Sequence, residues 1–213
     1  MLEVLNHRSR YFTVVLEDAY QAHNASAILR TCDCLGIQKI HFSGIKNTMK
    51  INDEIALGAE KWLDIRRWNT ENGGNEACLN YLKEKKYLIV ATSPHYHAFT
   101  PDTIPLDKPL AIIFGTEKEG LSEFWIQHAD YMLKIPMYGF TESYNLSVSA
   151  AIVLYTLVQR NKSNSLHYLS DNERKQILIK WLVQQVRDGD SMLEKYLKSK
   201  GWDGDRDRLL NYT

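Results

Sequence analysis

The sequence has few cysteines, no long apolar run and no net charge. Three cysteines in 213 residues are too few, and odd in number, for a disulfide framework. No apolar run approaches the ~20 residues that span a bilayer, and the first residues lack the apolar segment of a signal peptide. We therefore expect a cytoplasmic protein that does not enter a membrane. The 26 basic and 26 acidic residues cancel, which argues against a protein that holds nucleic acid by net charge, and DNA is not an expected partner.

Several catalytic signatures are missing as well. The chain has no GxGxxG loop, no GK[ST] phosphate loop and no nucleophilic serine elbow, which argues against dinucleotide-binding, P-loop and hydrolase functions. Cys32 and Cys34 form one close pair, and His95 and His97 form another, but neither pair has further ligands at a matching spacing. We therefore expect no metal site.

Short apolar segments alternate with helical patterns over the first 160 residues. Several of these segments are continuously apolar, as is typical of parallel strands that are buried on both faces. The pattern predicts an α/β fold in which helices cover a parallel sheet. The expected strands are Phe12–Leu16, Lys39–Phe42, Leu88–Ala91, Leu110–Phe114 and Tyr131–Ile135. The expected helices are Ala25–Leu35, Glu76–Lys86, Ser122–His128 and Leu146–Gln159.

The chain beyond residue 160 has a different pattern. A polar segment, Asn161–Ser170, precedes two helical patterns, Glu173–Arg187 and Ser191–Lys200. We therefore expect a first domain over 1–160 and a C-terminal helical extension over 161–213.

The first helix of this extension carries its own signals. Asp171 or Asn172 suits its N-cap position, because a short polar side chain can accept a hydrogen bond from the first turn. Apolar residues recur at helical spacing, which predicts one buried face. The face comprises Ile177, Leu178, Trp181, Leu182 and Val186.

Polar residues gather directly after three of the predicted strands, at the ends where open α/β sheets bind their ligands. The first cluster runs from His23 to Arg30. Asn24 suits the N-cap of the helix that follows. Arg30 lies on the first turns of that helix, where a guanidinium group can bind a phosphate through two parallel hydrogen bonds. An ordinary surface cation is the alternative interpretation of Arg30.

The second cluster, Phe114–Ser122, contains acids and glycines in a strand-end turn. Gly115 directly follows an apolar strand, so a ligand could approach the backbone there. Taken alone, the segment also fits an ordinary turn between a strand and a helix, with Ser122 as the N-cap. Thr92 and Ser93 place small polar side chains after another strand.

The third cluster is the most informative. Ile135 and Pro136 lead into a loop whose residues 141–145 all carry hydrogen-bonding side chains. The helix after it begins with small residues, which allow another backbone or a ligand to come close. A polar loop held between two segments built for burial is typical of a binding or catalytic site.

Taken in order, the three clusters resemble the signature motifs of the SpoU branch of the SPOUT RNA methyltransferases. The matching patterns are N-x-S-A-x-x-R at 24–30, F-G-x-E-x-x-G-L at 114–121 and I-P-M-x-G-x-x-x-S-x-N-x-S-V-S-A-A at 135–151. Each motif is a weak signal singly, but the three in this order are a strong one. Within the branch the chain is most similar to TrmH-type enzymes, which methylate the ribose 2′-OH of guanosine 18 in the D-loop of tRNA.

The resemblance implies an α/β domain with a trefoil knot at its C-terminal end, S-adenosylmethionine as the cofactor, an RNA substrate and a homodimer. It implies that the cofactor is held largely through backbone atoms. The implied cofactor-binding residues are Thr92, Phe114, Gly115, Ile135, Pro136, Met137, Tyr144 and Leu146. Tyr144 departs from the family, in which leucine is common at this position.

The resemblance also implies a set of catalytic residues. Arg30, together with a substrate phosphate, would help to remove the proton of the 2′-OH. Ser143 and Asn145 would orient that phosphate and Arg30. Asn24 and Glu117 would hold the catalytic loops.

The identity of the RNA stays open. tRNA is favoured, and ribosomal RNA is the alternative substrate. A catalytically silent RNA-binding relative and an α/β binding protein unrelated to RNA are also possible, but the complete set of catalytic residues argues against both. Because the net charge is zero, RNA contact would need a local basic patch. Its expected members are Arg8, Arg10, Lys46, Lys50, Arg66, Arg67 and the C-terminal tail.

Overall fold

The computed structural model describes residues 1–18, 21–44, 51–95, 98–116, 118–164 and 167–201. The chain forms two compact units. The larger unit is Ser9–His167, and the smaller unit joins Met1–Arg8 to the chain from Tyr168 onward. The sequence pattern does not predict that the first residues group with the C-terminal helices. The functional boundary after residue 160 stays a prediction.

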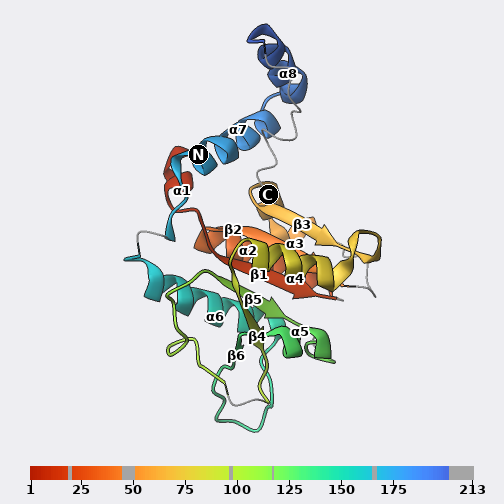
Figure 1. Ribbon diagram of the computed structural model, residues 1–213, viewed down its shortest axis with the longest axis vertical. Helices are drawn as coiled ribbons and strands as arrows, with labels where there is room; N and C mark the ends of the chain where they lie inside the picture. Colours follow the sequence, from red (N-terminus) through yellow and green to blue (C-terminus); the bar gives the residue numbers. More distant parts are fainter. Residues whose placement is uncertain (19–20, 45–50, 96–97, 117, 165–166, 202–213) are drawn as a thin grey trace. The chain divides into compact units, whose positions relative to one another are not determined.

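A parallel sheet forms the larger unit (Figure 1). Its strands are β1 (Ser9–Glu17), β2 (Ile37–Ser43), β3 (Asp64–Trp68), β4 (Leu88–Thr92), β5 (Leu110–Phe114) and β6 (Tyr131–Leu133). Within the described residues the spatial order is β3-β2-β1-β5-β4-β6, and every neighbouring pair is parallel. The predicted α/β fold with a parallel sheet is therefore confirmed.

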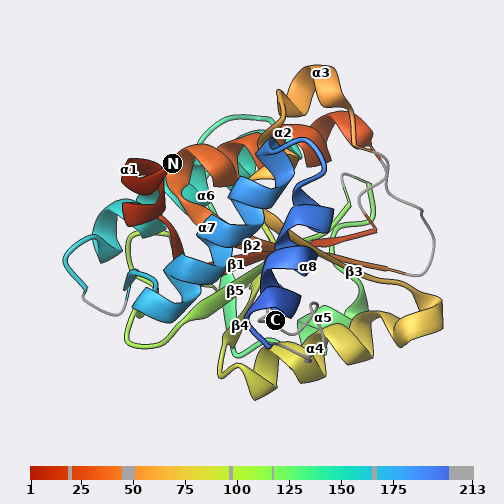
Figure 2. The same cartoon turned by 90° about the horizontal axis from the view of Figure 1, so that it is seen from above.

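Helices cover both faces of this sheet, α2 and α6 on one face and α4 and α5 on the other (Figure 2). Their bounds are α2 (Ala22–Leu35), α4 (Gly74–Glu84), α5 (Glu123–His128) and α6 (Leu146–Asn161). The side chains of β1 alternate between the faces: Val14 and Leu16 pack in the core with α2 and α6, and Val15 packs in the core with α4 and α5. Burial on both faces explains why the central strands are continuously apolar.

Three short elements connect the larger ones: α3 (Asp53–Ala56) and the 3₁₀ turns η1 (Ala59–Lys61) and η2 (Thr70–Asn72). They lie between β2 and α4, on either side of β3. None of the helices in the described part of the chain is both long and apolar enough to cross a lipid bilayer.

Strand β3 is absent from the sequence prediction because it is not an apolar run. Its sequence, DIRRW, carries two adjacent arginines, and it forms an edge of the sheet. The guanidinium group of Arg66 lies 4.0 Å from the ring centre of Trp68 and 4.6 Å from that of Tyr81 on α4. Stacking of a cation on aromatic rings therefore stabilises this strand, and its charges discourage pairing with another chain.

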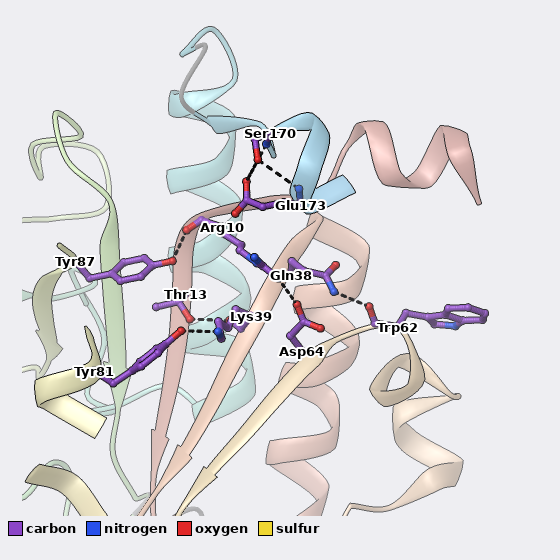
Figure 3. Close-up of polar contacts among 10 residues, drawn as sticks. All are labelled: Arg10, Thr13, Gln38, Lys39, Trp62, Asp64, Tyr81, Tyr87, Ser170 and Glu173. Atoms are coloured by element: carbon purple, nitrogen blue, oxygen red, sulfur yellow. Dashed lines mark hydrogen bonds and ion pairs between the residues drawn. The ribbon is translucent and has the colours of Figure 1, made fainter. Parts of the chain in front are cut away.

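The smaller unit contains α1 (Leu2–Asn6), α7 (Asp171–Gln185) and α8 (Gly189–Ser199). A capping box begins α7: the Ser170 backbone N–H donates to Glu173 Oε2 at 2.9 Å, and the Glu173 N–H donates to Ser170 Oγ at 3.4 Å (Figure 3). The predicted caps Asp171 and Asn172 are wrong, because the Ser-x-x-Glu pair satisfies two backbone N–H groups at once.

The predicted apolar face of α7 is correct only in part. Ile177 and Trp181 are buried, whereas Leu182 and Val186 are each 47% exposed. Arg8 is also buried, and its guanidinium group lies 5.3 Å from the ring centre of Trp181.

Burial and ion pairing make the basic patch predicted for RNA contact smaller than expected. Arg8 is buried, and Arg10 Nη2 forms an ion pair with Asp64 Oδ2 at 2.8 Å. Arg66 is half-buried and Arg67 is exposed. Lys46 and Lys50 lie outside the described residues.

A polar cluster lies toward the amino-terminal end of β1, against α4 (Figure 3). The Arg10–Asp64 ion pair joins β1 to β3 across β2. Tyr87 OH donates to the Arg10 carbonyl oxygen at 2.5 Å, and Lys39 Nζ donates to Tyr81 OH at 2.5 Å. These contacts use both charges and hydroxyl groups to hold β1, β2, β3 and α4 together.

Burial lowers the pKa of two titratable groups in this region. Desolvation, reinforced by the charge of Arg10, lowers the pKa of Lys39 from 10.5 to about 7. Desolvation and the charge of Lys39 lower the pKa of His41 to about 3. The indole N–H of Trp68 donates to His41 Nδ1 at 3.0 Å, so neutral His41 carries its proton on Nε2.

Burial of Lys39 makes stability depend on pH. In the unfolded chain a lysine titrates near ~10.4. Between about pH 7 and that value the unfolded state holds more protons than the folded state, so the free energy of unfolding rises with pH. We expect Lys39→Met to be more stable relative to the wild type at pH 6 than at pH 9, in urea unfolding at both pH values.

Thr13→Val is the matched control for this experiment. Thr13 Oγ1 donates to the Lys39 carbonyl oxygen at 2.8 Å, so the variant loses a buried hydrogen bond but no titratable group. Its difference from the wild type should be the same at both pH values. The same pH-independent difference in Lys39→Met would contradict the prediction.

Candidate active site

The segments after β4, β5 and β6 emerge at one edge of the sheet. β4 ends at Thr92, β5 ends at Phe114 and β6 ends at Leu133, and the three strands are neighbours. Because they are parallel, their carboxyl ends face the same side, where α/β sheets bind ligands. Thr92 Oγ1 donates to the Ile113 carbonyl oxygen at 2.8 Å and so fixes the end of β4 against β5.

A tight loop follows β5. Thr116 and Gly120 exchange two backbone N–H···O=C hydrogen bonds, of 2.9 and 3.1 Å. Gly115 is buried against this loop, and a Cβ atom on it would lie 2.2 Å from the Gly120 carbonyl oxygen. No other residue fits there without moving the backbone. Gly115 is therefore required for the shape of the loop itself.

The segment after β6 leaves its backbone groups unused. Within the described chain, no backbone hydrogen bond involves residues 135–144. Ile135 and Met137 are half-buried, while Tyr138 and Phe140 project fully into solvent. Most residues of this segment are exposed, so their N–H and C=O groups are accessible to a polar ligand. The segment therefore fits the main-chain binding that the resemblance implies for S-adenosylmethionine.

A pair of asparagines links the first motif to the third. Asn145 Nδ2 donates to Asn24 Oδ1 at 3.1 Å. Asn145 is also the N-cap of α6: its Oδ1 accepts from Ser147 N–H at 2.9 Å and from Val148 N–H at 3.4 Å. One side chain therefore starts α6 with its oxygen and holds α2 with its amide nitrogen.

Asn24 has a different place from the one predicted. Helix α2 begins three residues earlier than the predicted start, at Ala22, and Gln21 occupies its N-cap position. Asn24 is thus inside the first turn, where it is 1% exposed and donates from Nδ2 to Gln21 Oε1 at 3.2 Å. The cap prediction is wrong because the helix extends back to Gln21, which leaves Asn24 to bond across to Asn145. Gln21 is absent from the sequence prediction, although its spacing of three residues from Asn24 allows the two side chains to meet on one face of a helix.

Arg30 and Ser143 are the predicted residues that remain available to a ligand. Both are exposed, and neither forms a hydrogen bond or ion pair with a described residue. Arg30 lies on α2, two turns beyond Asn24, and Ser143 lies two residues before Asn145. The Asn24–Asn145 hydrogen bond thus connects the elements that carry them. Glu117 lies outside the described residues.

The other predicted cofactor-binding residues differ in burial. Phe114 is buried in the core with α2 and α6, and Ile135 and Leu146 pack against that core. Pro136 is exposed and Tyr144 is 45% exposed. Their placement leaves main-chain atoms, more than side chains, for contact with a ligand.

Potential metal ligands do not gather near this edge. Over the described ranges, no three His, Cys, Asp or Glu side chains come together as a metal site would require. Cys32 is buried in the core and Cys34 is exposed. His97 lies outside the described residues.

The sequence profile described as the SpoU rRNA Methylase family matches residues 11–155. The chain belongs to this family. The resemblance drawn from the three motifs is thus confirmed, and the SpoU match covers the sheet, except the first two residues of β1, and most of α6.

Curated relatives of this SpoU chain have closely related names. The tRNA (guanosine(18)-2′-O)-methyltransferase of Borreliella burgdorferi is 38% identical, with 87% of this chain and 84% of the relative covered. The enzyme of the same name from Thermus thermophilus is 34% identical, with 84% and 92% covered.

Solved structures agree with the fold. The crystal structure of the A. aeolicus TrmH/SpoU tRNA modifying enzyme matches with a TM-score of 0.77 and 30% identity, covering 87% of this chain and 94% of that one. The SpoU methyltransferase AviRb from Streptomyces viridochromogenes, in complex with its cofactor AdoMet, matches with a TM-score of 0.62 at 20% identity, covering 76% and 62%. At that identity the second match supports the fold alone.

The packing of Gly115 gives a testable prediction. Gly115→Ala should lower the free energy of unfolding by about 2 kcal/mol or more, because the added methyl group must displace backbone rather than a side chain. Urea unfolding measures the change. Gly139→Ala is the matched control, since its Cβ would lie 4.0 Å from the nearest heavy atom. Equal stability of the two variants would show that the loop yields easily.

Proposed function

We propose that this SpoU protein is an S-adenosylmethionine-dependent RNA ribose 2′-O-methyltransferase that modifies guanosine 18 of tRNA. The Asn24–Asn145 hydrogen bond carries the proposal, because it connects the helix that bears Arg30 to the loop that bears Ser143. The names of the relatives from B. burgdorferi and T. thermophilus support this reaction and favour tRNA over ribosomal RNA.

The reaction forms a bond between the ribose O2′ and the methyl carbon, and breaks the bond between that carbon and the sulfonium sulfur. The 2′-OH proton must leave as the oxygen attacks, and S-adenosylhomocysteine is the other product. Arg30 is a poor base by itself, because a guanidinium group stays protonated in proteins. In the proposed mechanism Arg30 instead holds the phosphate next to the ribose by bidentate hydrogen bonds, and this phosphate helps to remove the proton.

Ser143 and Asn145 assist Arg30 in the proposed site. The exposed Ser143 hydroxyl donates to the same phosphate. Asn145 keeps α2 and α6 together through Asn24, which places Arg30. Glu117 would hold the loop after β5. Most of the rate acceleration then comes from alignment of oxygen, methyl carbon and sulfur rather than from a strong base.

The cofactor supplies the methyl group when bound. Backbone groups at the ends of β4 and β5 and in the segment 135–144 would hold it. The unused backbone groups of that segment are the supporting observation. The residues we assign to the cofactor site are Thr92, Phe114, Gly115, Ile135, Pro136, Met137, Tyr144 and Leu146.

We place a trefoil knot in the segments that form this site. The segment that follows β4 pairs with β6: Ser93 N–H donates to the Leu133 carbonyl at 3.0 Å, and Phe99 N–H donates to the Met132 carbonyl at 2.9 Å. Lys134 N–H donates back to the Phe99 carbonyl at 2.9 Å, which completes a parallel bridge between Phe99 and Leu133. β6 ends at Leu133, two residues before the predicted end at Ile135.

The proposal extends to assembly and location. We propose a cytoplasmic homodimer in which α6 contributes to the interface. Val148 and Tyr155 on α6 are 45% and 58% exposed, which is unusual for large apolar side chains of a buried helix. We also propose that residues 1–160 carry the catalytic function and that the helical extension 161–213 assists RNA binding.

Replacement of Arg30 tests the proposed role. Arg30→Ala should reduce methyl transfer to tRNA at least ~100-fold, because the phosphate loses its bidentate partner. The affinity for S-adenosylhomocysteine, measured by calorimetry, should change less than about twofold, since Arg30 is not assigned to the cofactor site. Lys83→Ala, an exposed cation on α4, is the control and should leave both values unchanged. Loss of cofactor affinity together with activity would assign Arg30 a structural role instead.

The substrate is tested with defined transcripts. A tRNA with guanosine 18 should accept one labelled methyl group, and the same tRNA with 2′-deoxyguanosine at position 18 should accept none. Methylation of ribosomal RNA but not of tRNA would contradict the proposed substrate.

Asn145→Asp tests the link between the motifs. An aspartate still caps α6, because it keeps the accepting oxygen and suits a helix N-terminus. It replaces the donor to Asn24 by a second acceptor, so the link to α2 is lost. We expect a melting temperature close to that of the wild type and methyl transfer at least ~10-fold slower. Wild-type activity in this variant would exclude the hydrogen bond from the mechanism.

A further inference from the structure

A buried carboxylate lies at the end of β1, outside the three family motifs. Glu17 is the last residue of this strand and is 3% exposed. Over the described residues no cation forms an ion pair with it. A buried carboxylate without a cation is unfavourable unless hydrogen bonds satisfy its oxygens. Its hydrogen-bond partners therefore indicate why an acid occupies this position.

Glu17 accepts three hydrogen bonds from two residues. Ser122 donates twice, from its backbone N–H to Oε2 at 2.8 Å and from Oγ to Oε1 at 2.6 Å. Asn75, at the start of α4, donates from Nδ2 to Oε1 at 2.7 Å. All the partners donate, which suits an ionised carboxylate, because it can only accept.

The orientation of Asn75 is fixed from its other side. Ser43 Oγ, at the end of β2, donates to Asn75 Oδ1 at 2.5 Å. The amide group of Asn75 must then direct its nitrogen at Glu17. A chain of hydrogen bonds thus runs from Ser43 through Asn75 to Glu17, and anchors the carboxylate to β2 and α4.

The contact with Ser122 controls the loop after β5. Gly115 and Ser122 mark the two ends of this loop, and the Thr116–Gly120 hydrogen bonds close its middle. Leu121 is packed in the core with α4 and α5. The start of the loop continues directly from β5. Its other end, at Ser122, is held by the contact with Glu17 of β1.

The side chain of Ser122 contacts Glu17 instead of capping helix α5. Ser122 occupies the N-cap position of α5, as predicted, but its side chain makes no hydrogen bond to the first turn. Its hydroxyl group donates to Glu17 instead. A serine at the N-cap usually stabilises a helix by accepting a hydrogen bond from its first turn. Ser122 instead bonds to Glu17, so α5 lacks this stabilisation.

We infer that Glu17 is a positioning residue that holds the loop after β5 in the shape that binds the cofactor. It acts through Ser122, whereas the hydrogen bond from Asn75 satisfies Glu17 Oε1 without contacting the loop. The inference rests on the proposed function in one respect, that the loop beginning at Gly115 holds S-adenosylmethionine.

Two variants that each remove one hydrogen bond to Glu17 Oε1 separate positioning from stability. Ser122→Ala removes the hydroxyl's hydrogen bond and leaves only the backbone N–H bond to Glu17, so the end of the loop is held less firmly. The variant should weaken S-adenosylhomocysteine binding at least ~10-fold, which corresponds to the loss of one hydrogen bond to a charged group. Asn75→Ala should bind within about twofold of the wild type, although it should unfold at a lower temperature because Ser43 also loses its partner. Calorimetry and thermal unfolding measure the two properties.

Glu17→Gln and a distant control complete the test. Glu17→Gln removes the charge and replaces one acceptor by a donor at the contact with Ser122, and Ser122→Ala weakens the same contact. The double variant should therefore bind less than about twofold more weakly than Glu17→Gln alone. Tyr87→Phe, which loses a buried hydrogen bond at the other end of β1, should bind as the wild type does. Affinities that follow the unfolding temperature across all the variants would overturn the inference.

The outcome is independent of the RNA substrate. If the wild type binds S-adenosylhomocysteine but methylates no tRNA, the proposed function fails, while the comparison of Ser122→Ala with Asn75→Ala still decides the role of Glu17. If the wild type is active and the two variants bind equally well, only the inference about Glu17 fails.

Discussion

All the strands of the described sheet run in one direction, so their carboxyl ends all lie at the same edge. The segments that resemble methyltransferase motifs start at that edge, after β1, β5 and β6. The opposite end of β1 has a different character. There Arg10, Lys39 and Tyr81 form contacts that hold strands and helix together. The direction of the strands thus separates the part of the larger unit that we propose binds ligands from a part that serves stability.

The polar residues at the carboxyl-end edge fall into two groups. Asn24, Asn145 and Glu17 have their hydrogen-bonding atoms directed at other parts of the chain. Arg30 and Ser143 are exposed and make no such contact with the described residues. A group that already has intramolecular partners can orient its neighbours, whereas a group without them can bind substrate. This division assigns roles more directly than residue type does.

The sequence predicts the fold well where burial decides the structure. Strands β1, β4 and β5 contain apolar runs, and their burial in two cores follows from that pattern. Strand β3 is missed because stacking of Arg66 on Trp68 and Tyr81 stabilises it, and a local pattern does not reveal such contacts.

The ends of the helices are harder to predict, because several polar residues compete for each cap. Asn24 and Asn172 both suit an N-cap, yet Gln21 and Ser170 occupy those positions. In the site, order and spacing of motifs identify Arg30 and Asn145. Glu17 has no such signal, since a single acid after an apolar strand resembles any surface residue. Its significance depends on Ser122, which is remote in sequence and close in space.

The order of the strands also has a consequence for how the chain folds. Thr13 of β1 pairs with Lys39, close in sequence, whereas Phe12 pairs with Leu110, which is far away. Closing a long loop costs more conformational entropy, so pairings of distant segments form slowly. Strands β1, β2 and β3 come from segments that are close in the sequence and can pair early. The pairing of β1 with β5 joins segments that are far apart in the sequence. The binding edge is therefore completed late, and the protein acquires its function only after most of its architecture exists.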